Sequence, residues 1–443
     1  MRDLALLGGA PVRKHQFPAY KVIGREERDA VISVLDSGIL SRYIGADHDD
    51  FMGGEQVRKF EAEWAEALSS RHALAVNSAT SGLYAAVGAL GIGPGDEVIV
   101  SPYTMMASAT AAVVYNAVPV FADIDPNTFC LSVESIKEKI SPRTKAIIVV
   151  HIFGHPADMD PIMELAESNN IAVIEDAAQA PFAMYKGRPL GSVGNIGVFS
   201  LNYHKHIHTG EGGIVTTNNS ELAERISLIR NHAEAVVGKR NVKNIVNMVG
   251  FNFRMGEIEA AIGSCQLKKG PSLIDQRCTN VAYLEAKLNG MPGLTFQTCP
   301  DDIRHVYYVH PIKFDAKELG ISREIFVAAL RAELPETKLR EGEGALIGAG
   351  YVRPIYLEPM YQNQIAFGEK GYPFTNPNYK GKANYEKGIC PEAEKAHFET
   401  LITHELMRPP MSEADLDDVV SAFQKVLENL PALKKHEAAE AVA

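Results

Sequence analysis

The sequence has few cysteines and no long apolar run, and each absence excludes a class of protein. Its five cysteines are widely scattered and form no CxxC pair: Cys130, Cys265, Cys278, Cys299 and Cys390. This spacing excludes a zinc ribbon, argues against a disulfide framework and suits a reducing compartment. No apolar run approaches the length that crosses a bilayer. We therefore expect a soluble cytoplasmic protein.

Positive charge is also scarce in this chain. There are 44 Lys and Arg residues against 55 Asp and Glu, which gives a formal net charge of -11. A general nucleic-acid binder needs a positive field, so this balance argues against one. A local basic pocket that binds a small anion remains compatible with it.

What the sequence does have is a regular alternation of short apolar runs and longer amphipathic stretches. The apolar runs lie at 72–76, 97–100, 118–124, 145–150, 171–176, 196–200 and 212–217. Strands that alternate with helices indicate an α/β sheet, mostly parallel and covered on both faces. The last two runs are too close for a crossover helix between them, so we expect one antiparallel strand there.

The length of 443 residues exceeds the size at which one hydrophobic core usually stops growing, so we expect two domains. After residue 266 the pattern changes to helices at 271–288 and 322–334, a half-buried strand at 306–314 and loops at 335–400. An amphipathic helix at 412–430 precedes a polar tail that we expect to be frayed. The predicted division is an N-terminal arm at 1–40, a large α/β domain at 41–266 and a small α+β domain at 267–443.

Two motifs at predicted strand ends could bind a phosphorylated ligand. "NSATSGL" (77–83) joins a strand to a helix, and its small residues, free N–H groups and hydroxyls form a natural phosphate cradle. A plain helix N-cap is the alternative. "IEDAAQA" (174–180) places Asp176 at the end of a strongly apolar strand. A carboxylate there needs a cation or strong donors, unless it lies in a surface loop.

The motif "FSLNYHKHIHTGEGG" (199–213) places Lys205 among three histidines. A lysine whose proton affinity is lowered serves as a nucleophilic amine toward carbonyls, although a solvated basic loop is the commoner setting. His204, His206 and His208 would share a face only on an extended strand. No acidic residue or cysteine stands beside them, so we expect no metal site.

The order of these motifs is more informative than any one of them. Pyridoxal phosphate (PLP) has a phosphate, a pyridine nitrogen that must stay protonated and an aldehyde that an amine captures. A phosphate cradle, then Asp176, then Lys205 would supply a partner for each group. A further segment at 250–267 becomes a helix with small residues on one face, which suits close packing in a core or at a subunit interface.

In this order, the motifs resemble those of the DegT/DnrJ/EryC1/StrS aminotransferases, sugar and aminocyclitol transaminases of PLP fold type I. The resemblance runs from about residue 31 to residue 410. Its most specific segments are "LGIGPGDEVIV", "PRTKAIIVVHIFGHPADMD", "VIEDAAQA" and "FSLNYHKHIHTGEGG". It implies an aspartate aminotransferase-like α/β fold, with a mixed, mostly parallel sheet in the large domain and a smaller C-terminal α+β domain.

The resemblance also implies roles for single residues. Lys205 matches the lysine that holds PLP covalently and later moves a proton between substrate and cofactor. Asp176 matches the partner of the pyridinium nitrogen, and Gln179 matches the residue near the ring hydroxyl. A dehydratase branch of the family has histidine in place of this lysine, so Lys205 favours amino transfer.

Other cofactor contacts follow from the same resemblance. Ala79, Thr80 and Ser200 match phosphate ligands. Asn252 matches a residue that reaches the phosphate from a neighbouring subunit, which implies a homodimer with shared active sites. The family usually stacks an aromatic residue on the PLP ring. In "SPYTMMAS", Met105 stands at that position and Tyr103 two residues before it, and a thioether can pack on a ring.

The family implies transfer of an amino group from L-glutamate or L-glutamine to a keto-sugar, most often one linked to a nucleotide diphosphate. Lys239 and Arg240 are candidate cations for the diphosphate, although they could equally be solvated. An aminocyclitol ketone is the alternative acceptor, because the head "LALLGGAPVR" resembles that branch. A PLP-binding regulatory protein is an alternative of another class, which the pairing of Lys205 with Asp176 disfavours.

Overall fold

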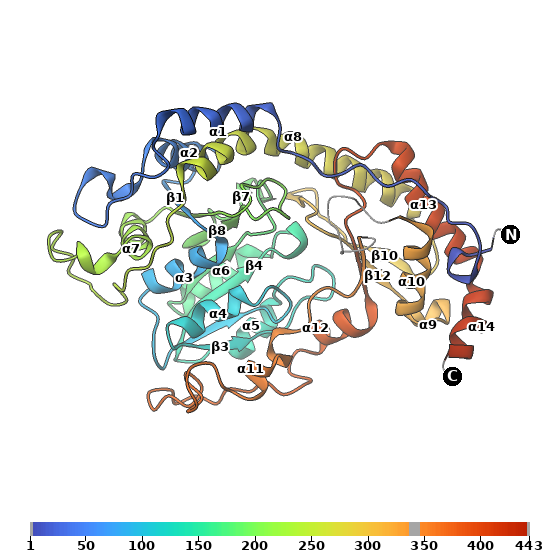
Figure 1. Ribbon diagram of the computed structural model, residues 1–443. Coiled ribbons are helices and arrows are strands. Elements are labelled where there is room, and N and C mark those ends of the chain that lie inside the picture. Colours follow the sequence, from blue (N-terminus) through green and yellow to red (C-terminus); the bar gives the residue numbers. More distant parts are fainter. Residues whose placement is uncertain (1–2, 336–345, 441–443) are drawn as a thin grey trace.

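The computed structural model describes residues 3–335 and 346–440 of the chain. Figure 1 shows a larger part built around a central sheet and a smaller part beside it, where both ends of the chain lie. The long helix α8 (Glu257–Leu288) runs along both parts and connects them. The candidate site lies where these two parts meet.

The central sheet has seven strands in the order β1-β9-β8-β5-β4-β2-β3. In chain order the strands are β1 (His72–Val76), β2 (Glu97–Val100), β3 (Val118–Phe121), β4 (Thr144–Val150), β5 (Ala172–Asp176), β8 (Ile196–Ser200) and β9 (Gly213–Thr217). Strand β9 is antiparallel to both of its neighbours, and the other pairs are parallel. The predicted mixed α/β sheet is confirmed, including its one antiparallel strand.

The strands are apolar runs because helices cover both faces of this sheet. In β4, the side chains of Ile147, Ile148 and Val149 are all fully buried. Seven further helices belong to this part: α1 (Arg25–Ser37), α2 (Glu55–Ala67), α3 (Ala79–Ala89), α4 (Ala107–Val114), α5 (Val133–Lys139), α6 (Met159–Ser168) and α7 (Ser220–Arg230). Helices α3 and α4 consist mainly of small residues, which lets them pack closely.

The smaller part is built on an antiparallel sheet in the order β10-β12-β14-β13. Its strands are β10 (Leu294–Phe296), β12 (His310–Phe314), β13 (Ile347–Ala349) and β14 (Leu401–His404). Its helices are α9 (Ala316–Leu319), α10 (Arg323–Glu333), α13 (Glu413–Glu428) and α14 (Leu430–Glu440). A second hydrophobic core lies between this sheet and α10 and α13. Strands β6 (Met184–Tyr185), β7 (Arg188–Pro189) and β11 (Ile303–Arg304) form a third, small sheet.

Two segments differ from the sequence-based expectation. The polar tail at 434–443 was expected to be frayed, but α14 continues to Glu440, and Leu433 near its start is fully buried in the second core; residues 441–443 lie outside the described residues. The region expected as loops at 335–400 contains β13, α11 (Pro359–Gln362) and α12 (Pro391–Lys395). Its tyrosines at 356, 361 and 385 pack around Phe121 of the central sheet. Residues 336–345 of that prediction lie outside the described residues.

The five cysteines are free thiols, and Cys130 and Cys390 are buried. Within residues 3–335 and 346–440, no helix combines the length and the apolarity needed to cross a membrane.

Candidate active site

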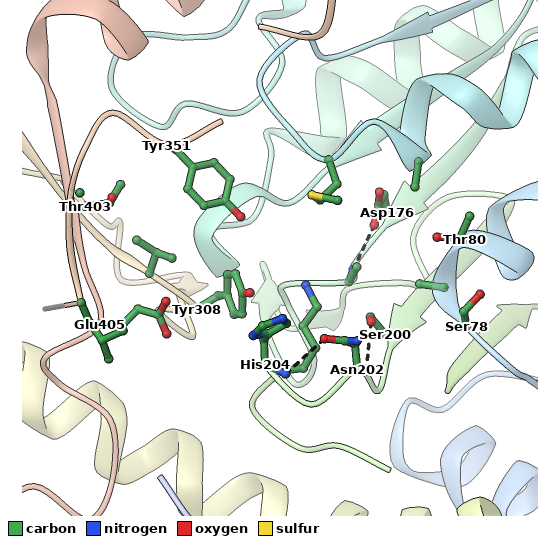
Figure 2. A pocket seen from close by; sticks show the side chains of 18 of the residues that line it. Ser78, Thr80, Asp176, Ser200, Asn202, His204, Tyr308, Tyr351, Thr403 and Glu405 are labelled. Carbon is green, nitrogen blue, oxygen red and sulfur yellow. Dashed lines mark hydrogen bonds between the residues drawn. The ribbon is translucent and has the colours of Figure 1, made fainter. Parts of the chain in front are cut away.

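A cavity of about 620 Å³ lies at the carboxyl ends of β5 and β8, where ligands bind in open α/β sheets. Residues of both parts of the molecule line it. Figure 2 shows Thr80, Asp176 and Ser200 on one side and Tyr351 and Glu405 on the other. Of the residues predicted from sequence, the structure brings six to its wall: Ala79, Thr80, Met105, Asp176, Ser200 and Lys205.

One end of the cavity is the start of α3. Ser78 is the N-cap, and its hydroxyl accepts a hydrogen bond from the Ser81 amide at 3.1 Å. The helix begins at Ala79, inside the motif that was predicted to join a strand to a helix. Amide groups in the first turn of a helix have no intrahelical acceptor, so they attract an anion. The cap and the phosphate cradle therefore coexist, because Ser78 serves the first while Thr80 faces the cavity.

A glycine lets β9 approach this helix start. A Cβ atom on Gly213 would lie 2.7 Å from the Ala79 nitrogen and 2.9 Å from the Phe199 carbonyl oxygen, which is closer than side chains tolerate. Gly213 also pairs with Ser200 across the β8–β9 ladder. The glycine therefore brings the hydroxyl group of Ser200 and the N-terminus of α3 to the same end of the cavity.

Asp176 is the last residue of β5 and is only 5% exposed, although it lines the cavity. Its Oδ2 accepts a hydrogen bond from the hydroxyl of Ser108 at 2.7 Å, and its Oδ1 accepts one from the amide of Ala178 at 3.2 Å. These two donors offset part of the cost of burying a carboxylate. Ser108 lies in α4, and no sequence pattern singled it out.

The preceding residue, Glu175, lies on the opposite side of the strand. Its carboxylate accepts hydrogen bonds from the amides of Gly191, Val193 and Gly194 and from Nε2 of His151, at 2.6 to 3.0 Å. Both carboxylate oxygens of Glu175 are therefore occupied by hydrogen bonds from within the protein. Of the two adjacent acids, Asp176 is the one that can meet a ligand.

Lys205 lies on the hairpin between β8 and β9. Its Nζ is 4.4 Å from the centre of the Tyr308 ring, and its backbone amide donates to the Asn202 carbonyl at 2.9 Å. The ring covers one side of the amine, while Asp176 lines the same cavity. The predicted nucleophile and the predicted acid thus face one space.

The three histidines around Lys205 do not converge. His206 is fully buried, and its Nε2 donates to the Val306 carbonyl at 2.8 Å. Burial, and then the nearby positive charge of Arg277, holds the pKa of His206 well below its usual value, so this ring is neutral at neutral pH. His204 lines the cavity against the Tyr203 ring, and no group of three metal-binding side chains occurs among the described residues.

The smaller part of the molecule supplies the opposite wall, which the sequence motifs did not reveal. Its lining residues include Arg331 of α10 and Tyr351, Thr403 and Glu405 from β14 and the segments beside it. Arg331 Nε donates to the Ile347 carbonyl at 2.7 Å, which fixes the guanidinium beside β13. These residues come from short strands and irregular segments that no local pattern identifies.

Two predicted cofactor ligands, Tyr103 and Gln179, do not line the cavity but lie behind Tyr351, which does. Tyr103 is fully buried and packs edge-on against Tyr351, with ring centres 6.2 Å apart. Gln179 donates to the Tyr351 hydroxyl at 3.1 Å and accepts from the Phe153 amide at 2.7 Å. Burial raises the pKa of Tyr351, so its hydroxyl stays protonated. Met105 does line the cavity and is 56% exposed.

Three further candidates do not line the cavity. Asn252 is exposed, and its carbonyl accepts from the Asn77 side chain at 3.4 Å beside the start of α3. Arg240 pairs with Asp47 at 2.9 Å, and Lys239 is its neighbour in sequence. The roles expected of Asn252, Lys239 and Arg240 therefore stay predictions.

The lining residues fit the groups of pyridoxal phosphate. A helix N-terminus with the Thr80 and Ser200 hydroxyls suits a phosphate, and the buried carboxylate of Asp176 suits a protonated ring nitrogen. An amine, that of Lys205, stands where an aldehyde would be captured. The donor set therefore accepts this cofactor.

Comparisons with known proteins agree with this geometry. Residues 26–376 match the model of the DegT/DnrJ/EryC1/StrS aminotransferase family. GDP-perosamine synthase of Caulobacter vibrioides is 38% identical over 402 residues, which cover 90% of this chain and 95% of the relative. The L-glutamine:2-deoxy-scyllo-inosose aminotransferase of Micromonospora echinospora is 32% identical over 441 residues, covering 97% and 99%. The crystal structure of DesI in the presence of its TDP-sugar product has a TM-score of 0.79 to this chain at 25% identity, and the match covers 99% of both chains.

Proposed function

Because the chain belongs to the DegT/DnrJ/EryC1/StrS aminotransferase family, we propose that its cavity binds pyridoxal phosphate and aminates a keto-sugar. Members of this family transfer amino groups, and the protein is an aminotransferase of amino-sugar biosynthesis. One observation carries the proposal: Lys205, Asp176 and the start of α3 line a single cavity.

The cofactor would be held by residues of the larger part. Thr80, Ser200 and the first turn of α3 would bind its phosphate, Asp176 would hold its ring nitrogen and the Met105 thioether would offer an apolar contact for its ring. When bound, the cofactor supplies an electron sink that stabilises negative charge on the substrate carbon. The negative charge of Asp176 keeps the ring nitrogen protonated, and Ser108 keeps that carboxylate aimed at it.

Lys205 has two tasks in this proposal. Its Nζ holds the cofactor aldehyde between turnovers and then moves a proton as general base and acid. The Tyr308 ring beneath Nζ limits the directions from which water reaches the amine. A lysine at this position favours amino transfer over the dehydration chemistry expected when histidine replaces it.

The donor is L-glutamate or L-glutamine, and the acceptor is a keto-sugar linked to a nucleotide diphosphate. GDP-perosamine synthase, the 38% identical relative, and DesI with its TDP-sugar product support such an acceptor. The wall from the smaller part suits it, because Arg331 offers a cation for a phosphate and Thr403 and Glu405 offer groups that bind hydroxyls.

Calorimetry with GDP and TDP on the cofactor-loaded protein tests this acceptor. We expect measurable binding, and we expect Arg331→Gln to weaken it about tenfold, since a charged hydrogen bond to phosphate is lost. Arg188→Gln, which removes a surface guanidinium paired with Asp160, is the matched control and should leave binding unchanged.

Two results would contradict the nucleotide-linked acceptor. Absence of binding together with amination of an inosose would assign the protein to the cyclitol branch, to which relatives at 30% to 32% identity belong. Bound cofactor without release of 2-oxoglutarate from glutamate or of 2-oxoglutaramate from glutamine, in the presence of any keto-sugar, would favour a regulatory protein instead.

The active protein is a homodimer in which Asn252 of each copy reaches the cofactor phosphate of the other. Asn252 is exposed beside the start of α3. Just before it, Ile245, Val246 and Val249 are 64%, 53% and 62% exposed. Apolar side chains gathered in this way are typical of a surface that another protein covers.

Light scattering with a substitution in this segment tests the dimer. Val249→Asp places a charge in the proposed interface, so we expect a shift toward monomer and at least a tenfold weaker affinity for the cofactor. Ile365→Asp changes a similarly exposed residue in a different segment and is the control. A monomeric wild-type protein with full activity would contradict the shared site.

A further inference from the structure

The N-terminal arm passes behind the hairpin that carries Lys205. Figure 1 shows this arm running from the smaller part along α8 to the start of α1. Tyr20 of the arm is only 6% exposed, and its hydroxyl donates a hydrogen bond to the His206 carbonyl oxygen. The arm therefore holds the backbone at the residue that follows Lys205.

A second tether joins the same two segments. Gln266 of α8 is fully buried. Its Nε2 donates to the Val22 carbonyl at 3.2 Å and to Glu27 at 2.8 Å, and its Oε1 accepts from the His208 amide at 3.3 Å. One side chain thus binds the arm on one side and the hairpin on the other.

The Tyr20 ring also connects to the tyrosine that covers Lys205. It lies between two guanidinium groups, 5.3 Å from that of Arg277 and 5.6 Å from that of Arg408. Arg277 is 2% exposed and donates to the carbonyls of Tyr307 and Tyr308 at 2.9 and 3.2 Å. Lys205 Nζ lies over the Tyr308 ring. Tyr20 therefore contacts the backbone next to Lys205 directly, and it contacts the segment that carries Tyr308 through Arg277.

We propose that Tyr20 is a positioning residue for Lys205, and that the N-terminal arm completes the catalytic site from behind. The inference rests on the proposed function, in which Nζ must reach both the cofactor and the substrate carbon. Small displacements of a reacting group cost large factors in rate. The hairpin contains Gly210 in a left-handed conformation (φ +86°), and Lys205 lines the cavity, so the position of its amine depends on how the hairpin backbone is held.

The first test uses the protein without cofactor. Tyr20→Phe keeps the ring between its two arginines and removes only the hydrogen bond to His206. Hydrogen exchange at the Lys205 and Thr209 amides, which bond to Asn202 and Leu201 within the hairpin, should become about tenfold faster. The control is Tyr283→Phe, which removes a tyrosine hydroxyl bonded to Asp417 on α13 and should leave this exchange unchanged.

The second test uses the cofactor-loaded enzyme. We expect Tyr20→Phe to lower kcat about fivefold to tenfold with KM within twofold, because the amine is misplaced while the substrate wall is intact. The absorbance band of the Lys205-bound cofactor should titrate with a shifted midpoint in this variant and not in Tyr283→Phe.

Each outcome bears on the proposal. Wild-type exchange and wild-type kcat in Tyr20→Phe would overturn it, as would equal losses in Tyr283→Phe, which would indicate general destabilisation. If Lys205 of the wild-type protein does not bind the cofactor at all, the proposed function fails. The exchange experiment then still decides whether the arm holds the hairpin.

Discussion

Replacement of Lys205 by alanine is expected to lower kcat by at least about 10³-fold, the largest effect of any substitution considered for this protein. Under the proposed function, this variant would lose the amine that captures the cofactor aldehyde and the group that moves the proton. No other lysine lines the cavity among the described residues, so no neighbour can take over the task. Stopped assays of 2-oxo acid release from glutamate and from glutamine, with cofactor in excess, measure the effect.

Two companion variants sharpen this experiment. Lys205→Arg keeps a positive charge but cannot form the covalent link, so it should be as inactive as Lys205→Ala. Lys186→Ala removes a surface lysine paired with Asp160 and should retain full activity. Turnover of Lys205→Ala above one tenth of the wild-type rate would refute the role of this residue.

Asp176→Asn should produce the second largest effect, a loss of roughly 10²-fold in kcat. The side chain keeps its shape and lies in a pocket that is nearly closed to water, where the charge of a carboxylate acts strongly. Under the proposed function, loss of that charge would lower the proton affinity of the ring nitrogen and make the cofactor a poorer electron sink. Steady-state kinetics and the cofactor absorbance spectrum report the two consequences separately.

A graded series controls for disturbance of the fold. Ser108→Ala removes one donor at 2.7 Å from Asp176 but keeps the charge, so its effect should be about tenfold or less. Asp160→Asn removes a surface carboxylate and should be neutral. If Ser108→Ala lowered kcat more than Asp176→Asn did, the negative charge of Asp176 would not be the property on which catalysis depends.

The larger part of the fold was predictable because its strands are buried on both faces. Such strands appear in a sequence as continuous apolar runs, and the runs at 72–76, 97–100 and 196–200 have the same bounds in the structure. The antiparallel direction of β9 was predictable from the short connection between β8 and β9, because no crossover helix fits in it. The spacing of the apolar runs along the sequence therefore predicted most of the strands of this sheet.

The near wall of the site was predictable for a similar reason. Asp176 stands at the end of a strand, Thr80 at the start of a helix and Lys205 on the hairpin that follows β8, and the carboxyl ends of these strands lie at one edge of the sheet. The resemblance to a family added their roles. Tyr103 and Gln179 were also predicted to contact the cofactor. In the structure both lie behind Tyr351, so their contact with a cofactor stays a prediction.

The far wall was not predictable from the sequence. Tyr351, Thr403 and Glu405 belong to short or irregular segments, and only tertiary packing brings them opposite Lys205. The same limit applies to Ser108 and Tyr20, whose partners lie 68 and 186 residues away. The domain boundary at 266/267 falls inside α8 and stays a prediction.

The most direct test of the central claim is borohydride reduction of the purified, cofactor-saturated protein, followed by mass spectrometry of its peptides. Reduction makes the bond between the cofactor and its lysine permanent. The account predicts a phosphopyridoxyl mass on Lys205, within the peptide 199–213, and none on Lys186. A label on another lysine, with residues 199–213 unmodified, would contradict it.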